Sequence, residues 1–538
     1  MSGLLTDLRR AAPVLLSSAG PLSPGGDPYS GRRLRPGRWA SPRMIALVAV
    51  TVGYLAGRPR DQLAWAGTGV LLVLTAVEPL LERMQPRTVA LQLPGFAPAR
   101  RSVAARVLVP LALLLLLVLA LVAVLRGSPW WFAAAAAAQA LVLTVAAAAA
   151  LRAYAGRAAR TRALRAALEA YRPELVLHTA RRGALYQVQM WLPQLEELRR
   201  TGRRYAIVTR DEGALAGLAT LTDVPVVARP AWRELDDVVV PSLRAALYVN
   251  SVAANADFVT YRQLTHVYLG HGESDKALSY HPAHAMYDLI FVSGQAAIER
   301  YASNGVVIPA EKFVVVGRPQ SAAVQRADRP VAEVAAPAVL YAPTWAGYND
   351  STTHSSLPQA LAVVSALLRR PGTVIFRPHP FSRERPAERA HVQAVETLLA
   401  RDAARTGRVH RYGTVVARQT FSDSANAADA MLADVSSVLV EFLASDKPMA
   451  VVAVGEGVPR FTERHGVAAG AYVVAADLSN LDEVLDDLLG PDPLRATREQ
   501  VLRHYVGVAD PGAAFHRALT GVLDGGAPGG GALPGSVP

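Results

Sequence analysis

The 538-residue chain contains no cysteine. This absence excludes disulfide bonds, thiolate nucleophiles and zinc or iron–sulfur sites with cysteine ligands. The first 43 residues also lack the apolar core and small-residue cleavage site of a secretory signal peptide, and we expect them to form a disordered basic arm. The glycine- and proline-rich segment 521–538 is expected to be a disordered tail.

Most of the chain lacks a net positive charge, although the formal net charge of the whole is +12. Residues 1–170 carry 20 Arg and Lys against 6 Asp and Glu, whereas the rest of the chain carries 36 against 38. The larger, C-terminal part is therefore nearly neutral, so we do not expect nucleic acid to be its partner.

Long apolar stretches explain the basic excess. Residues 103–125 and 130–151 each approach the roughly 20 residues that span a bilayer, and two weaker stretches, 44–56 and 63–81, precede them. Arginines gather before the first stretch, between the second and third, and after the fourth. By the positive-inside rule, this pattern predicts about four transmembrane helices within residues 44–151 of a multi-pass protein of the bacterial plasma membrane, with its C-terminal part in the cytoplasm.

The C-terminal part has the pattern of an α/β protein. After a basic linker helix expected over residues 152–170, short apolar, β-branched segments alternate with helical patterns, as for parallel strands buried on both faces. A charged, proline-containing connector at 326–337 divides the series. We expect two doubly wound Rossmann-like lobes, 171–330 and 331–520, that face each other across a cleft. The expected strands are 175–178, 205–209, 224–228, 246–249, 265–269, 289–292 and 313–316, then 339–342, 374–376, 430–432, 449–452 and 472–474.

A histidine between two glycines follows the expected strand 265–269. Gly270 and Gly272 remove the side chains that would keep a ligand from the backbone, and His271 and Lys276 supply a base and a cation. In open α/β sheets ligands bind at the carboxyl ends of the strands, so the segment is a candidate phosphate-binding loop.

Similar polar groups follow other expected strands. Arg377 and His379 come directly after 374–376, Thr344 follows 339–342, and Arg318 follows 313–316. Asp434, Ser436, Ser437 and Glu441 come after the strand 430–432 and enter a helical segment. The two serines suit a helix cap or a phosphate, and these groups converge if both lobes fold as expected.

Four of these segments together resemble the CDP-glycerol glycerophosphotransferase family, the teichoic-acid primases and polymerases of bacterial cell walls, whose catalytic domain has the GT-B fold. The matching residues are His271, Gly272 and Lys276; Ala342 to Trp345; His379 and Pro380; and Asp434, Ser436 and Ser437. The resemblance covers roughly residues 174–515. The chain departs from the family pattern at Glu273 to Asp275, at Ala346, at Val435 and at Glu441.

The resemblance implies transfer of glycerol phosphate, or another polyol phosphate, from CDP-glycerol to a hydroxyl of a lipid-linked acceptor, with release of CMP. It implies that His271 and His379 are the catalytic histidines, with His271 as the general base, and that Glu441 holds a ribose hydroxyl. The implied donor-binding groups are His379, Lys276, Arg318 and Arg377 for charge on the diphosphate and the leaving CMP, Thr344, Ser436 and Ser437 for phosphate oxygens, and Asp434 beside them.

Two other functional classes are consistent with the same pattern. One is a membrane-anchored GT-B glycosyltransferase that uses a UDP- or GDP-sugar, and the other is a non-catalytic GT-B-like partner of wall-polymer enzymes. No cofactor is indicated. Glu273 and Asp275 could attract a divalent metal ion, but two acids in a loop are more often solvated.

Overall fold

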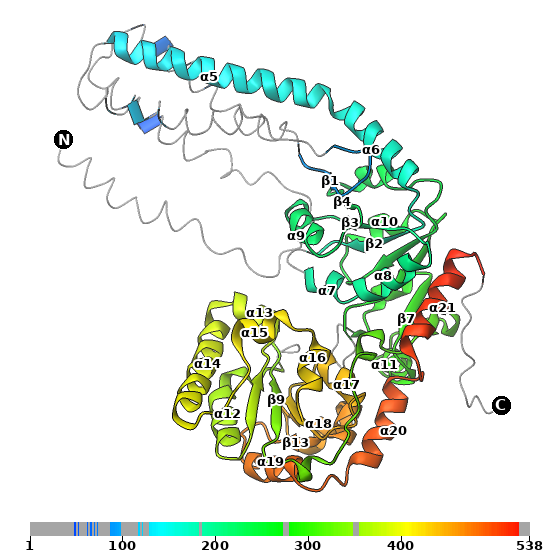
Figure 1. Ribbon diagram of the computed structural model, residues 1–538. Helices are drawn as coiled ribbons and strands as arrows, with labels where there is room; N and C mark the ends of the chain where they lie inside the picture. The colour runs from blue at the N-terminus through cyan, green and yellow to red at the C-terminus, as the bar shows by residue number, and fades with distance from the viewer. Residues whose placement is uncertain are drawn as a thin grey trace.

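The computed structural model describes residues 87–97, 129–181, 185–272, 279–347 and 354–526, together with scattered positions between 48 and 121. Two α/β lobes, called here the N-lobe and the C-lobe, account for most of them, and a long helix extends from the N-lobe (Figure 1). The expected α/β fold of two Rossmann-like lobes, a GT-B-like architecture, is thus present.

The N-lobe is built on an eight-stranded sheet in the order β1-β4-β3-β2-β5-β6-β7-β8. Neighbouring strands are parallel, except that β1 pairs with β4 in the antiparallel direction. All residues of β2 and β3 are buried, as the continuous apolar runs predict for strands covered on both faces. The strands are β1 Ala90–Leu91, β2 Leu175–Thr179, β3 Tyr205–Thr209, β4 Val226–Ala228, β5 Ala245–Tyr248, β6 Thr265–Tyr268, β7 Leu289–Val292 and β8 Phe313–Val315.

Helices cover both faces of this sheet, and each face has its own apolar core. On one face pack α7 (Leu185–Gln189), α8 (Leu192–Arg200) and α9 (Leu215–Ala219). On the other face pack α6 (Arg157–Tyr171), α10 (Asn255–Val259) and α11 (Gln295–Ser303).

The C-lobe has a parallel five-stranded sheet in the order β10-β9-β11-β12-β13. Its strands are β9 Ala338–Ala342, β10 Thr373–Phe376, β11 Ala430–Ala433, β12 Met449–Val452 and β13 Tyr472–Val474. Its helices are α12 Ala360–Leu368, α13 Pro380–Glu384, α14 Pro386–Thr406, α15 Gly413–Arg418, α16 Phe421–Asn426, α17 Ser437–Leu443, α18 Val458–Arg464 and α19 Leu481–Leu489. The helices α12, α14 and α19 cover one face of the sheet, and α15 to α18 cover the other.

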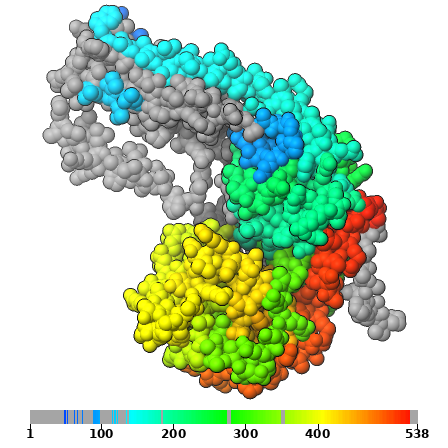
Figure 2. Space-filling view, viewed as in Figure 1, coloured from blue at the N-terminus to red at the C-terminus, as the bar shows by residue number. Residues whose placement is uncertain are grey.

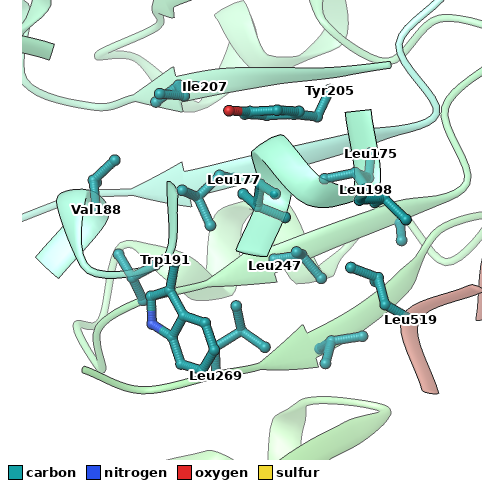
Figure 3. Packing of buried hydrophobic residues seen from close by; sticks show 14 of the residues in the cluster. Leu175, Leu177, Val188, Trp191, Leu198, Tyr205, Ile207, Leu247, Leu269 and Leu519 are labelled. Carbon is teal, nitrogen blue, oxygen red and sulfur yellow. The ribbon is translucent and has the colours of Figure 1, made fainter. Parts of the chain in front are cut away.

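The chain finally returns to the N-lobe. Helix α20 (Arg495–Tyr505) packs against α17 and α11, and α21 (Pro511–Leu523) lies on the N-lobe (Figure 2). Leu519 of α21 belongs to the same core cluster as Leu177 and Leu247 (Figure 3). Chain order alone assigns α21 to the second lobe, and its continuation to Leu523 makes the first residues of the expected tail helical.

Where the chain crosses from the C-lobe back to the N-lobe, it comes into close contact with the N-lobe backbone. A Cβ at Gly294 would lie 2.7 Å from backbone atoms of His504 and Tyr505, and one at Gly317 would lie 2.4 Å from Val508 Cγ2. Glycine at these two positions lets the α20–α21 connection lie against the N-lobe.

One strand of the N-lobe comes from far away in the sequence. The segment 87–97 supplies β1, with Ala90 paired to Val227, and Leu93 is buried. Gln92 Nε2 donates to the carbonyls of Ala219 and Thr222 at 2.9 and 2.8 Å. The loop expected between the second and third membrane spans is therefore part of the N-lobe (Figure 2).

The fourth expected membrane span coincides with a helix. Helix α5 runs from Pro129 to Ala155, contains no acidic residue and continues almost directly into α6 (Figure 1). Its segment Ala137–Ala155 is long and apolar enough to cross a bilayer, the one such helix in the part of the chain that the structure describes. Of the other three expected spans the structure describes only the scattered positions, which are helical, and the basic arm 1–43 and most of the tail lie outside the described residues.

Candidate active site

The strand orders locate one topological switch point in each sheet. In the N-lobe, β2 lies between β3 and β5, and in the C-lobe β9 lies between β10 and β11. Loops on the two sides of such a point leave in opposite directions and open a crevice at the carboxyl ends of the strands. The candidate loops at residues 270–272, 343–345, 377–379 and 434–437 all follow strands at these ends.

A pocket of about 160 Å³ lies where the two crevices meet. Residues of both lobes line it, including both candidate histidines and both candidate serines. The side chains that carry polar or aromatic groups are Arg181, Tyr186, Tyr268, His271, Ser279, Phe291 and Tyr301 from the N-lobe, and Thr344, Trp345, His379, Phe381, Ser436 and Ser437 from the C-lobe.

His271 is held by the backbone of a neighbouring strand end. Its Nδ1 lies 3.2 Å from the carbonyl oxygen of Val249, directly after β5. Because a carbonyl oxygen can only accept, Nδ1 must carry the proton, which leaves the lone pair on Nε2. The pKa of His271 is lowered to about 4, first by burial and then by the Arg181 guanidinium. At neutral pH the ring is thus neutral and able to accept a proton through Nε2.

His379 has the opposite tautomer. It precedes α13, where Pro380 occupies the first helical turn, and its Nδ1 accepts the backbone N–H of Phe381 at 3.2 Å. Nδ1 therefore carries the lone pair, and in the neutral ring Nε2 carries the proton. His379 can donate a hydrogen bond through Nε2 where His271 can accept one.

Glycine is required on each side of His271 for a different structural reason. Gly270 has φ +64°, a left-handed conformation that favours glycine, and its carbonyl accepts the indole N–H of Trp191 at 2.9 Å. Gly272 lies against the C-lobe, where an added Cβ would come within 3.2 Å of Ser437 Cβ. Gly272 thus allows the His271 loop to approach the start of α17.

The aspartate of the Asp-x-Ser-Ser motif is buried behind the C-lobe wall and holds its loops by hydrogen bonds. Asp434 is fully buried, and its Oδ2 accepts the N–H groups of Thr344 and Ser356 at 2.7 and 3.0 Å. It ties the loop after β9 to the end of β11. Thr344, Ser436 and Ser437 line the pocket, whereas Asp434 positions the loops that carry them.

Arg318 and Glu441, expected to bind donor, contact each other. Arg318 Nη2 lies 2.6 Å from Glu441 Oε1, and both side chains are buried. Arg318 follows β8 and Glu441 lies in α17, so the ion pair joins the two lobes close to the pocket.

The remaining expected cations are placed differently. The Arg377 guanidinium donates to the carbonyls of Val416 and Gln419 at 2.8 and 3.1 Å and is not among the pocket-lining groups. Lys276, with Glu273 and Asp275, lies outside the described residues. Among the residues that the structure does describe, no group of three His, Asp or Glu side chains is arranged to hold a metal ion.

The motifs do not include several side chains of the pocket, among them Arg181, Tyr186 and Phe381. Arg181 follows β2, Tyr186 lies in α7, and Phe381 follows His379. The Tyr186 ring is 6.3 Å from the His271 ring and 6.0 Å from the His379 ring, and it is nearly perpendicular to both. Arg181 had the same signal as His271, a polar residue just after an apolar strand.

Comparison with solved structures finds low similarity over most of the chain. A wall teichoic acid polymerase TagF, soaked with CDPG, is 12% identical with TM-score 0.46, covering 70% of this chain and 97% of that chain. The S. aureus MnaA–UDP structure is 13% identical with TM-score 0.43, covering 65% and 96%. A glycosyltransferase from Rickettsia africae is 11% identical with TM-score 0.42, covering 66% and 99%. Similarity at this level does not identify a substrate or an activity.

Sequence comparison is more specific. No curated protein matches the chain. The family model described as CDP-glycerol:poly(glycerophosphate) glycerophosphotransferase matches residues 239–456, a region that contains all four motifs. The resemblance to the CDP-glycerol glycerophosphotransferase family that the motifs predicted is thereby confirmed for residues 239–456 of this chain.

Proposed function

We propose that this protein is a membrane-anchored transferase that moves glycerol phosphate, or another polyol phosphate, from CDP-glycerol to a hydroxyl of a lipid-linked wall-polymer acceptor. The observation that carries the proposal is the pair of histidines with opposite tautomers in one pocket between the lobes. One histidine can accept the proton of an attacking hydroxyl, and the other can donate to a phosphate.

The proposed reaction is one displacement at phosphorus. The acceptor hydroxyl loses its proton to His271 Nε2, and its oxygen forms a bond to the glycerol-bearing phosphorus of CDP-glycerol. The bridging P–O bond breaks, and CMP leaves with the electron pair. General-base catalysis of this kind contributes about 10²- to 10⁴-fold.

Stabilisation of the developing negative charge supplies the remaining rate enhancement, because phosphoryl transfer depends mainly on positioning and electrostatics. His379 lines the C-lobe wall of the pocket, and its Nε2–H is the group that would donate to a phosphate oxygen. Thr344, Ser436 and Ser437 add hydroxyl groups on the same wall of the pocket. The donor phosphates are therefore assigned to the C-lobe, and the acceptor hydroxyl to the N-lobe beside His271.

The membrane part of the proposal is supported by α5. Its Trp130, Leu141 and Leu151 are 75, 66 and 56% exposed, an arrangement that suits lipid better than water. Helix α6 follows at once and packs on the N-lobe core through Leu164 and Leu168. A span at α5 would hold the pocket near the cytoplasmic face of the plasma membrane, where lipid-linked acceptors are available.

The test measures CMP release by the full chain in detergent, with CDP-glycerol, CDP-ribitol or UDP-glucose as donor and a lipid-phosphate extract as acceptor. We expect CMP from a CDP-polyol, a loss of at least about 100-fold in His271→Ala, and wild-type turnover in His281→Ala, a matched histidine outside the pocket lining. Release of UDP from the sugar nucleotide alone would identify a glycosyltransferase instead, and no turnover of any donor would favour a non-catalytic partner.

A further inference from the structure

Tyr186 lies beside both histidines although it belongs to no motif. It comes from α7 of the N-lobe, and its ring also contacts Phe381 of the C-lobe, with 5.7 Å between centroids. Tyr186 thus lines the pocket at the position where the base, the C-lobe histidine and the C-lobe wall meet.

A buried amide network fixes the direction of the Tyr186 hydroxyl. Gln187 Nε2 donates to the Tyr186 oxygen at 3.2 Å, and Gln187 Oε1 accepts from Asn250 Nδ2 at 3.3 Å. Asn250 Nδ2 also donates to Thr179 Oγ1 at 3.1 Å. Gln187 and Asn250 are 0 and 1% exposed. Because the tyrosine oxygen already accepts the amide hydrogen, its own hydrogen is left for a different acceptor.

Burial keeps the Tyr186 hydroxyl protonated. The pKa of Tyr186 is raised, chiefly by burial, so the hydroxyl remains protonated at neutral pH. Tyr186 therefore presents a neutral donor beside His271.

Arg181 brings a positive charge to the same wall. It follows β2, the strand at the N-lobe switch point, and its guanidinium carbon lies 5.9 Å from the Phe381 ring centroid. Its charge is one cause of the lowered pKa of His271, and it interacts with Tyr186. A guanidinium cation and a hydroxyl donor on the same wall together match an anionic oxygen.

We infer that Arg181 and Tyr186 form a phosphate-binding subsite on the acceptor side of the pocket, which holds the phosphate next to the attacking hydroxyl. The inference rests on the proposed function and deepens it. Both residues share the N-lobe wall with His271, the group that must touch the acceptor hydroxyl, whereas the serine and threonine hydroxyls assigned to the donor lie on the C-lobe wall. The subsite would select acceptors that end in a polyol phosphate over uncharged polyols.

The first test is binding, which does not depend on turnover. Calorimetric titration of the full chain in detergent with glycerol 3-phosphate, in the presence of saturating CDP, should show binding by the wild type. We expect Tyr186→Phe and Arg181→Gln each to weaken it roughly ten- to hundredfold, as for the loss of a hydrogen bond to a charged group. Tyr171→Phe is the matched control, because the Tyr171 hydroxyl donates to the Tyr205 carbonyl and is outside the pocket lining.

Three results of this titration would overturn the subsite: no binding by the wild type, equal binding by Tyr186→Phe, or competition between CDP and glycerol 3-phosphate. The last result would place the phosphate on the donor side.

The second test separates acceptor from donor by kinetics. In Tyr186→Phe, the KM for a phosphate-bearing acceptor should rise roughly tenfold or more, and this rise should exceed any change in the KM for CDP-glycerol or in kcat/KM with plain glycerol as acceptor. A rise in the KM for CDP-glycerol instead would refute the acceptor assignment. Failure of the wild type to release CMP with either acceptor would count against the proposed function, and the calorimetric result would still decide the subsite.

Discussion

The chemistry available in the pocket depends on single residues, because backbone hydrogen bonds determine which ring nitrogen of each histidine is protonated. The Val249 carbonyl accepts a hydrogen bond from the Nδ1–H of His271, and the Phe381 N–H donates a hydrogen bond to the Nδ1 lone pair of His379. Two chemically identical side chains thereby become an acceptor and a donor. The contact of His379 is local, two residues along the chain, whereas the contact of His271 cannot be read from the local sequence, because Val249 is 22 residues away.

The lowered pKa of His271 predicts the pH dependence of the reaction. The base must be unprotonated in the free enzyme, so kcat/KM should fall only as pH decreases through the folded pKa of about 4, and not near the usual histidine value of 6.5. We expect a nearly flat rate from pH 7 to about pH 5. The measurement is initial rates with unsaturating donor in short assays, each followed by return to pH 7 to show that the enzyme is intact. An acidic limb centred near pH 6.5 would contradict the assignment.

A second buried histidine makes folding sensitive to acid. His178 is fully buried in β2, with the Tyr248 and Phe258 rings 5.2 and 5.3 Å away, and its pKa is lowered to about 3 by burial, then by Arg210 and His266. The unfolded chain takes up a proton below about pH 6.5, but the folded chain stays neutral down to about pH 3. Stability is therefore lost as pH falls within this window, by about 2 kcal/mol at pH 5 from this group alone.

The substitution His178→Leu should remove that contribution. Between pH 7 and pH 5, the wild type should lose about 2 kcal/mol more of its unfolding free energy than the variant does, as measured by denaturant titration at both pH values. Parallel losses in the two proteins would mean that His178 is protonated in the folded state.

Between elements, the stability of the fold depends on the buried Arg318–Glu441 ion pair. It joins the end of β8 to α17, with both side chains nearly inaccessible to water. Glu441→Gln keeps the shape but leaves the Arg318 charge buried without a counter-charge, which should destabilise the protein by about 3–5 kcal/mol in denaturant titration. By contrast, Glu169→Gln, which breaks the exposed Arg165 pair in α6, should cost about 0.5 kcal/mol or less.

The double variant Arg318→Met, Glu441→Leu tests whether the unpaired charge causes the loss of stability in Glu441→Gln. Because two apolar side chains carry no buried charge, most of the lost stability should return. If the double variant is as unstable as Glu441→Gln, the pair contributes through specific geometry and not through charge. The expected role of Glu441 at a ribose hydroxyl is tested in the same variants by the KM for CDP-glycerol.

Most strands could be predicted from the sequence because they belong to parallel sheets covered on both faces. Tyr205–Thr209, Leu289–Val292, Met449–Val452 and Tyr472–Val474 have the expected bounds. The strand expected at 246–249 is displaced by one residue, and the other strands expected after residue 171 differ by one or two residues at one end. β1 was missed. It has only two residues, lies at the sheet edge and pairs with a strand more than 130 residues later, so no local apolar run indicates it.

The candidate site was predictable where side chains follow strands and less so where packing decides. His271, His379, Thr344 and both serines meet in the pocket. Arg377 follows its strand equally closely, but its guanidinium turns to the backbone carbonyls of Val416 and Gln419. The direction of a long side chain depends on the partners that surround it, and those come from helices elsewhere in the chain.

For the whole molecule, β1 constrains how the chain can cross a membrane. Residues 90–91 are hydrogen-bonded within the N-lobe sheet, and α6 packs on the same lobe. The chain therefore leaves the N-lobe after residue 97 and returns to it by residue 157. The number of crossings between these points must be even, so the stretches 103–125 and 130–151 cross together or not at all.

Labelling of single cysteines can decide this topology, since the chain has none of its own. We expect Ala97→Cys, at an exposed position after β1, and Glu483→Cys, exposed on α19, to react with a membrane-impermeant maleimide only after cells are permeabilised. Gly127→Cys, between the two apolar stretches, should react in intact cells. If Gly127→Cys also needs permeabilisation, the two stretches do not cross and the membrane anchor proposed at α5 is wrong. If Ala97→Cys reacts in intact cells while Glu483→Cys does not, the β1–β4 pairing cannot exist in the membrane-bound protein, because one sheet cannot lie on both sides of a bilayer.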